Sequence, residues 1–216
     1  MIENNLLTNK NITNQKIWLH KLTGAKYKST RNELNIANGL TANKAKRYLE
    51  TRAILRNSIS NLYALDPMHI PIKSIPNKPI ELPPGMGSIN ISHCSDALII
   101  AWCSKRIGID IERKDRQFNY VDFEHIYLNN RREKKYNKLN QLEVLNRWCG
   151  IEAAIKWDEG NLASDIVNWD YNFSQNYILN NKKKLRLEVN QFYFLDWTIS
   201  IALRDSDIKF TPMICY

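Results

Sequence analysis

Apolar and polar residues alternate over residues 107–112, with the sequence IGIDIE, in the pattern of a β-strand. In such a strand the three isoleucines share one face, while Asp110 and Glu112 share the other. Two carboxylates so close together repel each other, and they cost free energy unless a cation lies between them. The pattern therefore predicts a buried apolar face and a cation near the two acids.

Two long helices are predicted by apolar residues that recur at helical spacing. The first covers residues 41–65, where Thr41 is placed to cap the start. The second covers residues 141–157, where Gly160 is placed to end it. Residues 65–87 contain six of the seven prolines, which predicts an extended, ordered loop rather than a helix.

Strands account for much of the remaining chain. Lys105 and Arg106 lie between two apolar runs, which predicts a tight hairpin turn that joins strand 97–103 to strand 107–112. Each half of the chain contains a long helix and apolar strands, although no internal repeat is strong enough to demonstrate a duplication. A mixed α+β fold is therefore predicted. The other predicted strands are residues 16–22, 88–92 and 196–205, with a further hairpin at residues 177–189.

Composition restricts the class of protein. A chain of 216 residues with 44% apolar residues can form one large domain or two small halves with a proper core. No apolar run approaches the roughly 20 residues that span a bilayer, and the N-terminus lacks the apolar stretch of a signal peptide. We therefore expect a cytoplasmic protein that does not enter a membrane, with the Asn-rich residues 1–14 frayed.

The net charge of +9 lies entirely in the first half of the chain. Residues 1–108 contain 15 Lys and Arg against 6 Asp and Glu, whereas residues 109–216 contain 16 of each sign. A basic half indicates an anionic partner, which leaves nucleic acid, membrane headgroups, a phosphate-rich small molecule and a merely solvated basic surface open. The polar surface of the helix at residues 41–65 is predicted to carry Lys44, Lys46, Arg47, Arg52 and Arg56.

The second helix adds a third carboxylate. Glu152 and Lys156 lie one helical turn apart and share a face. Three acids can hold a hard cation such as Mg²⁺, and a lysine beside them can contact a phosphate. Taken alone, Glu152 and Lys156 fit a solvated salt bridge, and Asp110 and Glu112 fit the polar face of a half-exposed strand. The chain has neither a GxxxxGK[ST] nor a GxGxxG motif, so side chains and a metal would have to bind any phosphate.

Four sequence blocks together resemble a known family. IGIDIE is similar to (V/I)G(I/V)D(I/V)E, WCGIEAAIK is similar to W-x-x-K-E-A-x-x-K, and PNKPIEL followed by INISHC is similar to G-K-P and (F)N-(I/L)-S-H-S. In this order and spacing the blocks resemble the 4′-phosphopantetheinyl transferases of the surfactin type, over about residues 40–175. The resemblance implies a monomer of two similar α+β halves, residues 1–106 and 107–216. Each half would be a small antiparallel sheet packed against a long helix, with a pseudo-twofold axis between the halves and the active site at their interface.

The resemblance also implies the site residues, position by position. Asp110, Glu112 and Glu152 match the Mg²⁺ ligands, and Glu133 matches a further acid near the metal. Glu152 and Lys156 are the implied catalytic residues, and Lys156 would contact a phosphate. The residues implied for the coenzyme A pocket are Lys78, Ser92 and His93, at its 3′-phosphate and adenosine end, and more loosely Arg47, Arg52 and Arg56.

The implied reaction moves the 4′-phosphopantetheine group of coenzyme A to a serine hydroxyl of an apo acyl or peptidyl carrier protein. Adenosine 3′,5′-bisphosphate is the second product, and the acidic carrier suits the positive charge of this chain. Ile151 stands where the family pattern has a lysine, which leaves open a coenzyme A-binding paralogue with weakened catalysis. A nucleic-acid-binding module is a further alternative, although three convergent acids would repel a phosphate backbone.

Overall fold

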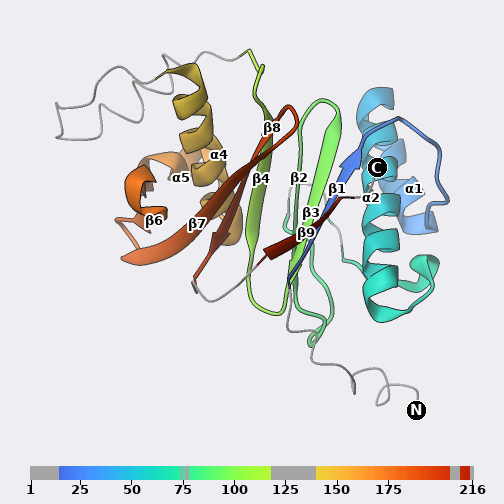
Figure 1. The fold of residues 1–216 in the computed structure, drawn as a ribbon. Helices are drawn as coiled ribbons and strands as arrows, with labels where there is room; N and C mark the ends of the chain where they lie inside the picture. The colour runs from blue at the N-terminus through green and yellow to red at the C-terminus, as the bar shows by residue number, and fades with distance from the viewer. Residues whose placement is uncertain (1–14, 74, 76–77, 118–139, 205–209, 215–216) are drawn as a thin grey trace.

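Two β-sheets and four α-helices make up the described part of the chain, which covers residues 15–73, 75, 78–117, 140–204 and 210–214 of this computed structural model. The helices of the first half lie on one side of the molecule, and the strands at its centre separate them from the long helix of the second half (Figure 1). The predicted mixed α+β class is therefore confirmed. Across the described ranges, no helix combines the length and the apolar character needed to cross a membrane.

The first sheet contains four strands in the order β2-β3-β1-β9. Neighbouring strands are antiparallel, apart from β1 and β9, which are parallel. The last strand of the chain thus joins a sheet that is otherwise built from the first half of the sequence. The three strands predicted in that half are confirmed. The strands are β1 (Gln15–Lys21), β2 (Ser88–His93), β3 (Ala97–Cys103) and β9 (Phe210–Ile214).

Helix α2 (Ala42–Tyr63) packs against the first sheet and follows a short helix, α1 (Arg31–Asn38). Leu55 and Ile59 on α2 are fully buried in a core that they share with side chains of β1, β2 and β3. The predicted first helix is therefore confirmed. Its N-terminus differs in one respect, because the side chain of Thr41 makes no capping hydrogen bond.

The second sheet contains five antiparallel strands in the order β4-β8-β7-β6-β5. Apolar side chains of α4 pack with those of the strands to form its core. The predicted hairpin at residues 177–189 and the predicted strand at residues 196–205 are both confirmed. The elements are β4 (Gly108–Arg113), α4 (Gln141–Trp157), α5 (Leu162–Asp165), β5 (Trp169–Asn172), β6 (Tyr177–Asn180), β7 (Leu185–Phe194) and β8 (Trp197–Leu203).

Local hydrogen bonds fix both ends of α4. The side chain of Asn140 accepts from the N–H of Glu143, and the side chain of Glu143 accepts from the N–H of Asn140, which makes a capping box. At the other end Glu159 adopts a left-handed conformation with φ 55°, and the N–H of Gly160 donates to the carbonyl of Ile155 at 2.9 Å. The predicted helix is confirmed at both ends because each end carries its own sequence signal.

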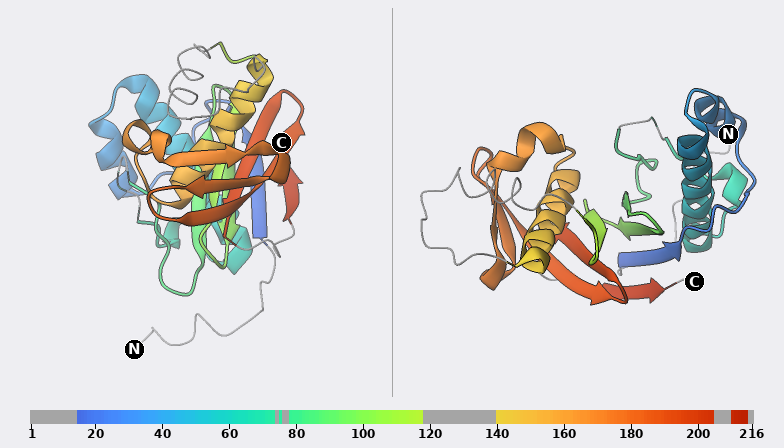
Figure 2. Two further views of the ribbon diagram at one scale, coloured as in Figure 1. Left: turned by 90° about the vertical axis from the view of Figure 1, so that its left-hand side faces the viewer. Right: turned by 90° about the horizontal axis from the view of Figure 1, so that it is seen from above.

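The two sheets adjoin at their edge strands β2 and β4. The predicted hairpin turn at Lys105 and Arg106 is wrong, because β3 and β4 belong to different sheets. Strand β3 has no free edge for β4, since β1 and β2 already pair with its two sides. The chain therefore crosses from one sheet to the other at this turn. In the view from above, the strands of the junction lie between α4 and α2 (Figure 2).

Candidate active site

Asp110 and Glu112 on β4 and Glu152 on α4 bring their carboxylates to one place. One oxygen of each acid lies within 4.8 Å of an oxygen of each of the other two. Asp110 is 1% exposed and Glu112 is 8% exposed, so these acids do not form the polar face of a half-exposed strand. Buried carboxylates at such short range need a compensating cation.

A glycine allows α4 to approach β4 closely. A Cβ atom added to Gly108 would lie 2.0 Å from the carbonyl oxygen of Ala153 and 2.7 Å from the backbone nitrogen of Trp157. The helix therefore crosses the strand at a distance that only glycine permits. Because Ala153 follows Glu152, and Gly108 precedes Asp110 by two residues on the strand, this contact places the two carboxylates beside each other.

Lys156 provides a cation from the chain itself. Its Nζ lies 2.7 Å from Asp110 Oδ1 and 3.2 Å from Glu152 Oε1, and it donates to Ser92 Oγ at 2.8 Å. Ser92 Oγ donates in turn to Asp110 Oδ1 at 2.7 Å. Burial lowers the pKa of Lys156, but the negative charges of Asp110 and Glu152 outweigh burial and raise it. The pair formed by Glu152 and Lys156 is therefore part of a mostly buried network and is not a solvated salt bridge.

The acids retain capacity for a further cation. Asp110 Oδ2 is buried and has no hydrogen-bond partner among the residues that the structure describes, which costs free energy unless a cation or a water satisfies it. Burial raises the pKa of Glu152, and the charge of Asp110 raises it further, whereas Lys156 opposes the shift. Glu112 forms an ion pair with Arg116. Three carboxylates with an unsatisfied oxygen among them fit a hard divalent ion such as Mg²⁺, which prefers oxygen ligands.

The site joins three segments that are far apart in the sequence, namely β2, β4 and α4. No protein-family model and no curated protein matches this chain. Chemically, the arrangement can hold a divalent ion next to an ammonium group, which is a setting for a substrate that carries phosphates.

The residues implied for coenzyme A are only partly brought together. Asp110, Glu112 and Glu152 form the acidic cluster, and Ser92 donates a hydrogen bond directly to Asp110. His93 follows Ser92 at the end of β2. His93 is exposed at its surface, but desolvation lowers its pKa, and the positive charges of Arg47 and Lys156 lower it further, whereas a backbone hydrogen bond and the charge of Asp110 oppose the shift. Lys78 is exposed and, within the described ranges, makes no hydrogen bond or ion pair with these groups.

Arg52 and Arg56 are buried, so the prediction that they lie on the polar surface of the first helix is wrong. Arg56 forms an ion pair with Glu33 of α1 and donates to the carbonyl oxygen of Lys28 at 2.6 Å. The guanidinium of Arg52 lies 4.9 Å from the ring centroid of Tyr48. Both side chains are covered because α1 packs over this part of α2. Their assignment to the coenzyme A pocket stays a prediction.

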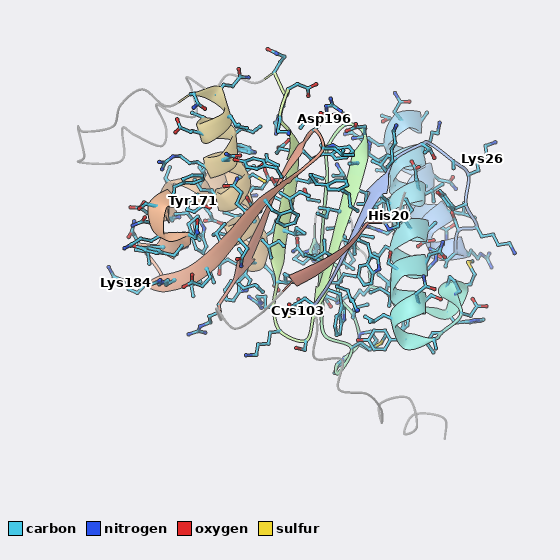
Figure 3. All side chains as sticks on the ribbon, viewed as in Figure 1. His20, Lys26, Cys103, Tyr171, Lys184 and Asp196 are labelled. Atoms are coloured by element: carbon cyan, nitrogen blue, oxygen red, sulfur yellow. The ribbon has the colours of Figure 1, made fainter. Side chains whose placement is uncertain are left out.

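Two unusual positions in α4 have packing explanations. A Cβ atom at Gly150 would lie 2.4 Å from the ring of Tyr171, which packs against the helix there (Figure 3). Ile151 is fully buried in the core of the second sheet, where a lysine would bury a charge. Ile151 therefore packs in the core of this chain. Glu133 lies outside the described residues.

The sequence did not indicate Arg116 as a neighbour of the acids. In a continuing strand, a residue four positions after Glu112 would lie about 13 Å away. Instead the chain turns after β4, and the N–H of Arg116 donates to the carbonyl oxygen of Arg113 at 3.0 Å. This turn returns Arg116 to Glu112. Asp115, a residue type that favours turns, is the one local signal that could have suggested it.

Proposed function

We propose that this chain is a 4′-phosphopantetheinyl transferase, which moves the 4′-phosphopantetheine group of coenzyme A to a serine of an apo acyl or peptidyl carrier protein with Mg²⁺ as cofactor. One observation supports this most directly. Ser92, Asp110 and Lys156 come from three of the four sequence blocks that resemble the family, and they contact one another within 2.8 Å. A nucleic-acid-binding module gives no reason for these contacts, because buried acids repel a phosphate backbone.

The proposal includes a fold of two related halves with the site at their junction. Each sheet packs against one long helix, α2 or α4, and the sheets adjoin at β2 and β4. Strand β9 departs from a strict division at residues 106 and 107, since it pairs with β1 of the first half. The monomeric state and the cytoplasmic location belong to the same proposal and rest on the sequence and the resemblance.

The side chains of the site have separate roles in this reaction. When bound by Asp110, Glu112 and Glu152, Mg²⁺ would neutralise charge on the pyrophosphate of coenzyme A. Lys156 stabilises the charge that develops on the departing adenosine bisphosphate. Glu152 accepts the proton of the carrier serine as the new oxygen–phosphorus bond forms and the bond to the departing bisphosphate breaks. Holding the two substrates in line supplies much of the rate, as is general for phosphoryl transfer.

Intact-mass measurement tests the proposal directly. The chain is incubated with coenzyme A, Mg²⁺ and a panel of apo carrier proteins, and we expect one carrier to gain the mass of one phosphopantetheine group. A carrier whose acceptor serine is replaced by alanine is the control and stays unchanged. Binding of coenzyme A without any mass gain on any carrier would favour the paralogue with weakened catalysis. A salt-dependent shift of nucleic acid in a gel would favour the nucleic-acid-binding alternative.

Added salt is expected to raise the KM for the carrier protein more than the KM for coenzyme A. The first half exposes several cations to solvent, among them Lys26 at the outer edge of the molecule (Figure 3). Attraction between such a surface and an acidic carrier is screened by salt, whereas contacts at a partly buried site are screened less. Steady-state kinetics at several ionic strengths, with each substrate varied in turn, measure both values. An equal rise of the two KM values would contradict docking by charge.

A further inference from the structure

Arg116 is a positively charged residue that lies beside the acidic cluster and pairs with one of its members. Its guanidinium forms an ion pair with Glu112, and it lies 5.8 Å from the ring centroid of Trp148 on α4. Its backbone carbonyl accepts a hydrogen bond from the side chain of Gln141 at 3.3 Å. The turn after β4 is thus held against the start of α4, and the arginine is held on the carboxylate.

Among the described residues, two cations balance the charge of the three acids. Lys156 forms ion pairs with Asp110 and Glu152, while Arg116 forms an ion pair with Glu112. The side chain of Glu112 is only 10% exposed, so its carboxylate has little access to any other positive group. Asp110 still offers an unsatisfied oxygen to an incoming ion, whereas Glu112 is already occupied. Arg116 pairs with one oxygen of Glu112, so a divalent ion that takes all three acids either displaces the guanidinium or shares the carboxylate with it, and in both cases the positive charge opposes the ion.

We propose that Arg116 competes with the divalent ion for Glu112 and so weakens the binding of the free ion. This inference rests on the proposed function, since it assigns Glu112 to the metal. In the absence of the ion the arginine keeps Glu112 neutralised. When the ion binds, the guanidinium leaves the carboxylate and turns to solvent, which its side chain already reaches at 38% exposure. Arg116 is a residue that regulates occupancy of the site through Glu112 and is not itself a metal ligand.

Binding of Mn²⁺ alone, followed by electron paramagnetic resonance in the absence of coenzyme A, tests the inference on the full chain. We expect Arg116→Gln to bind Mn²⁺ roughly three- to fivefold more tightly than the unmodified chain, the range for loss of a partly exposed ion pair. Arg116→Lys keeps a positive charge at the position and is expected to restore most of the weaker affinity.

Lys114→Gln is the matched control. It removes one positive charge two residues from Glu112, but the Lys114 ammonium lies 5.8 Å from the ring centroid of Tyr193. We expect the affinity for Mn²⁺ to change less than twofold in this variant. An equal gain from both Gln variants would overturn the inference, because the effect would then be one of general charge.

The outcomes separate this inference from the proposed function. Equal or weaker binding by Arg116→Gln, with clear binding by the unmodified chain, overturns the competition and leaves the metal site standing. Binding by Arg116→Gln alone supports the competition in a strong form. Absence of binding in both proteins, with unchanged circular dichroism spectra, overturns the competition and the proposed metal site together.

Discussion

Replacing Asp110 by Asn is expected to lower the proposed Mg²⁺-dependent transfer of phosphopantetheine by about a thousandfold or more. Asp110 offers one oxygen to Lys156 and Ser92 and a second, unsatisfied oxygen to the ion. Asparagine has the same shape and can still accept a hydrogen bond, so the variant is expected to fold. It cannot supply the negative charge that holds a divalent ion. The measurement is kcat/KM for a carrier protein, with Mn²⁺ binding as a second readout.

Asp115→Asn is the matched control for this experiment. Asp115 lies on the same segment and is exposed, and it pairs with Arg113 at 2.7 Å outside the acidic cluster. Its replacement is expected to leave kcat/KM within about twofold, since exposed ion pairs contribute little. An Asp110→Asn protein that retains more than about a tenth of the activity would contradict the metal assignment, because loss of a stabilising charge at the reacting centre costs far more.

Local sequence signals predicted much of the fold. The alternation in IGIDIE predicted β4, and apolar residues at helical spacing, followed by Gly160, predicted α4 over the residues 141–157 that it occupies. These features are local because strand periodicity and helix caps depend on a few neighbouring residues. The same reasoning places the hairpin of β6 and β7, whose turn contains three adjacent lysines.

Pairing between distant strands could not be predicted in this way. The short connection after β3 suggested a hairpin, but both edges of β3 are taken by β1 and β2. Whether β4 can pair with β3 depends on which strands from other parts of the chain already pair with β3. The same limit applies to Arg56, since a helical pattern cannot show that a second helix will bring Glu33 over it. Burial of a charged residue is decided by the tertiary partner.

The acids of the candidate site were predictable, and their surroundings were not. Helical and strand spacing, together with the family resemblance, selected Asp110, Glu112 and Glu152, and the structure brings them together. The two counter-ions of these acids are positioned by different parts of the structure. Lys156 follows from the spacing within α4, whereas Arg116 depends on a turn that reverses the chain after β4.

Replacing Gly108 by Ala is expected to lower the free energy of unfolding by about 2–3 kcal/mol, the usual cost of an overpacked core. The added methyl group meets backbone atoms of Ala153 and Trp157, which cannot rotate away as a side chain could. The strain is relieved only if α4 moves away from β4, and this movement carries Glu152 and Lys156 away from Asp110. Activity is therefore expected to fall about a hundredfold, since a shift near 1 Å at a reacting centre can cost that much. Urea unfolding and kcat/KM, measured where the variant is fully folded, check the two effects.

Gly39→Ala separates this geometry from the general effect of adding a methyl group to a glycine. Gly39 lies at the end of α1 with φ −87°, and the nearest atom to an added Cβ is 3.6 Å away, which is ordinary contact. Both the stability and the activity of this variant are expected to stay close to those of the unmodified chain. If Gly108→Ala lost stability but kept full activity and metal affinity, the spacing of α4 over β4 would not determine the site. Because the glycine and the acids belong to one short strand, the sequence that brings the helix close is also the sequence that supplies two of the three carboxylates.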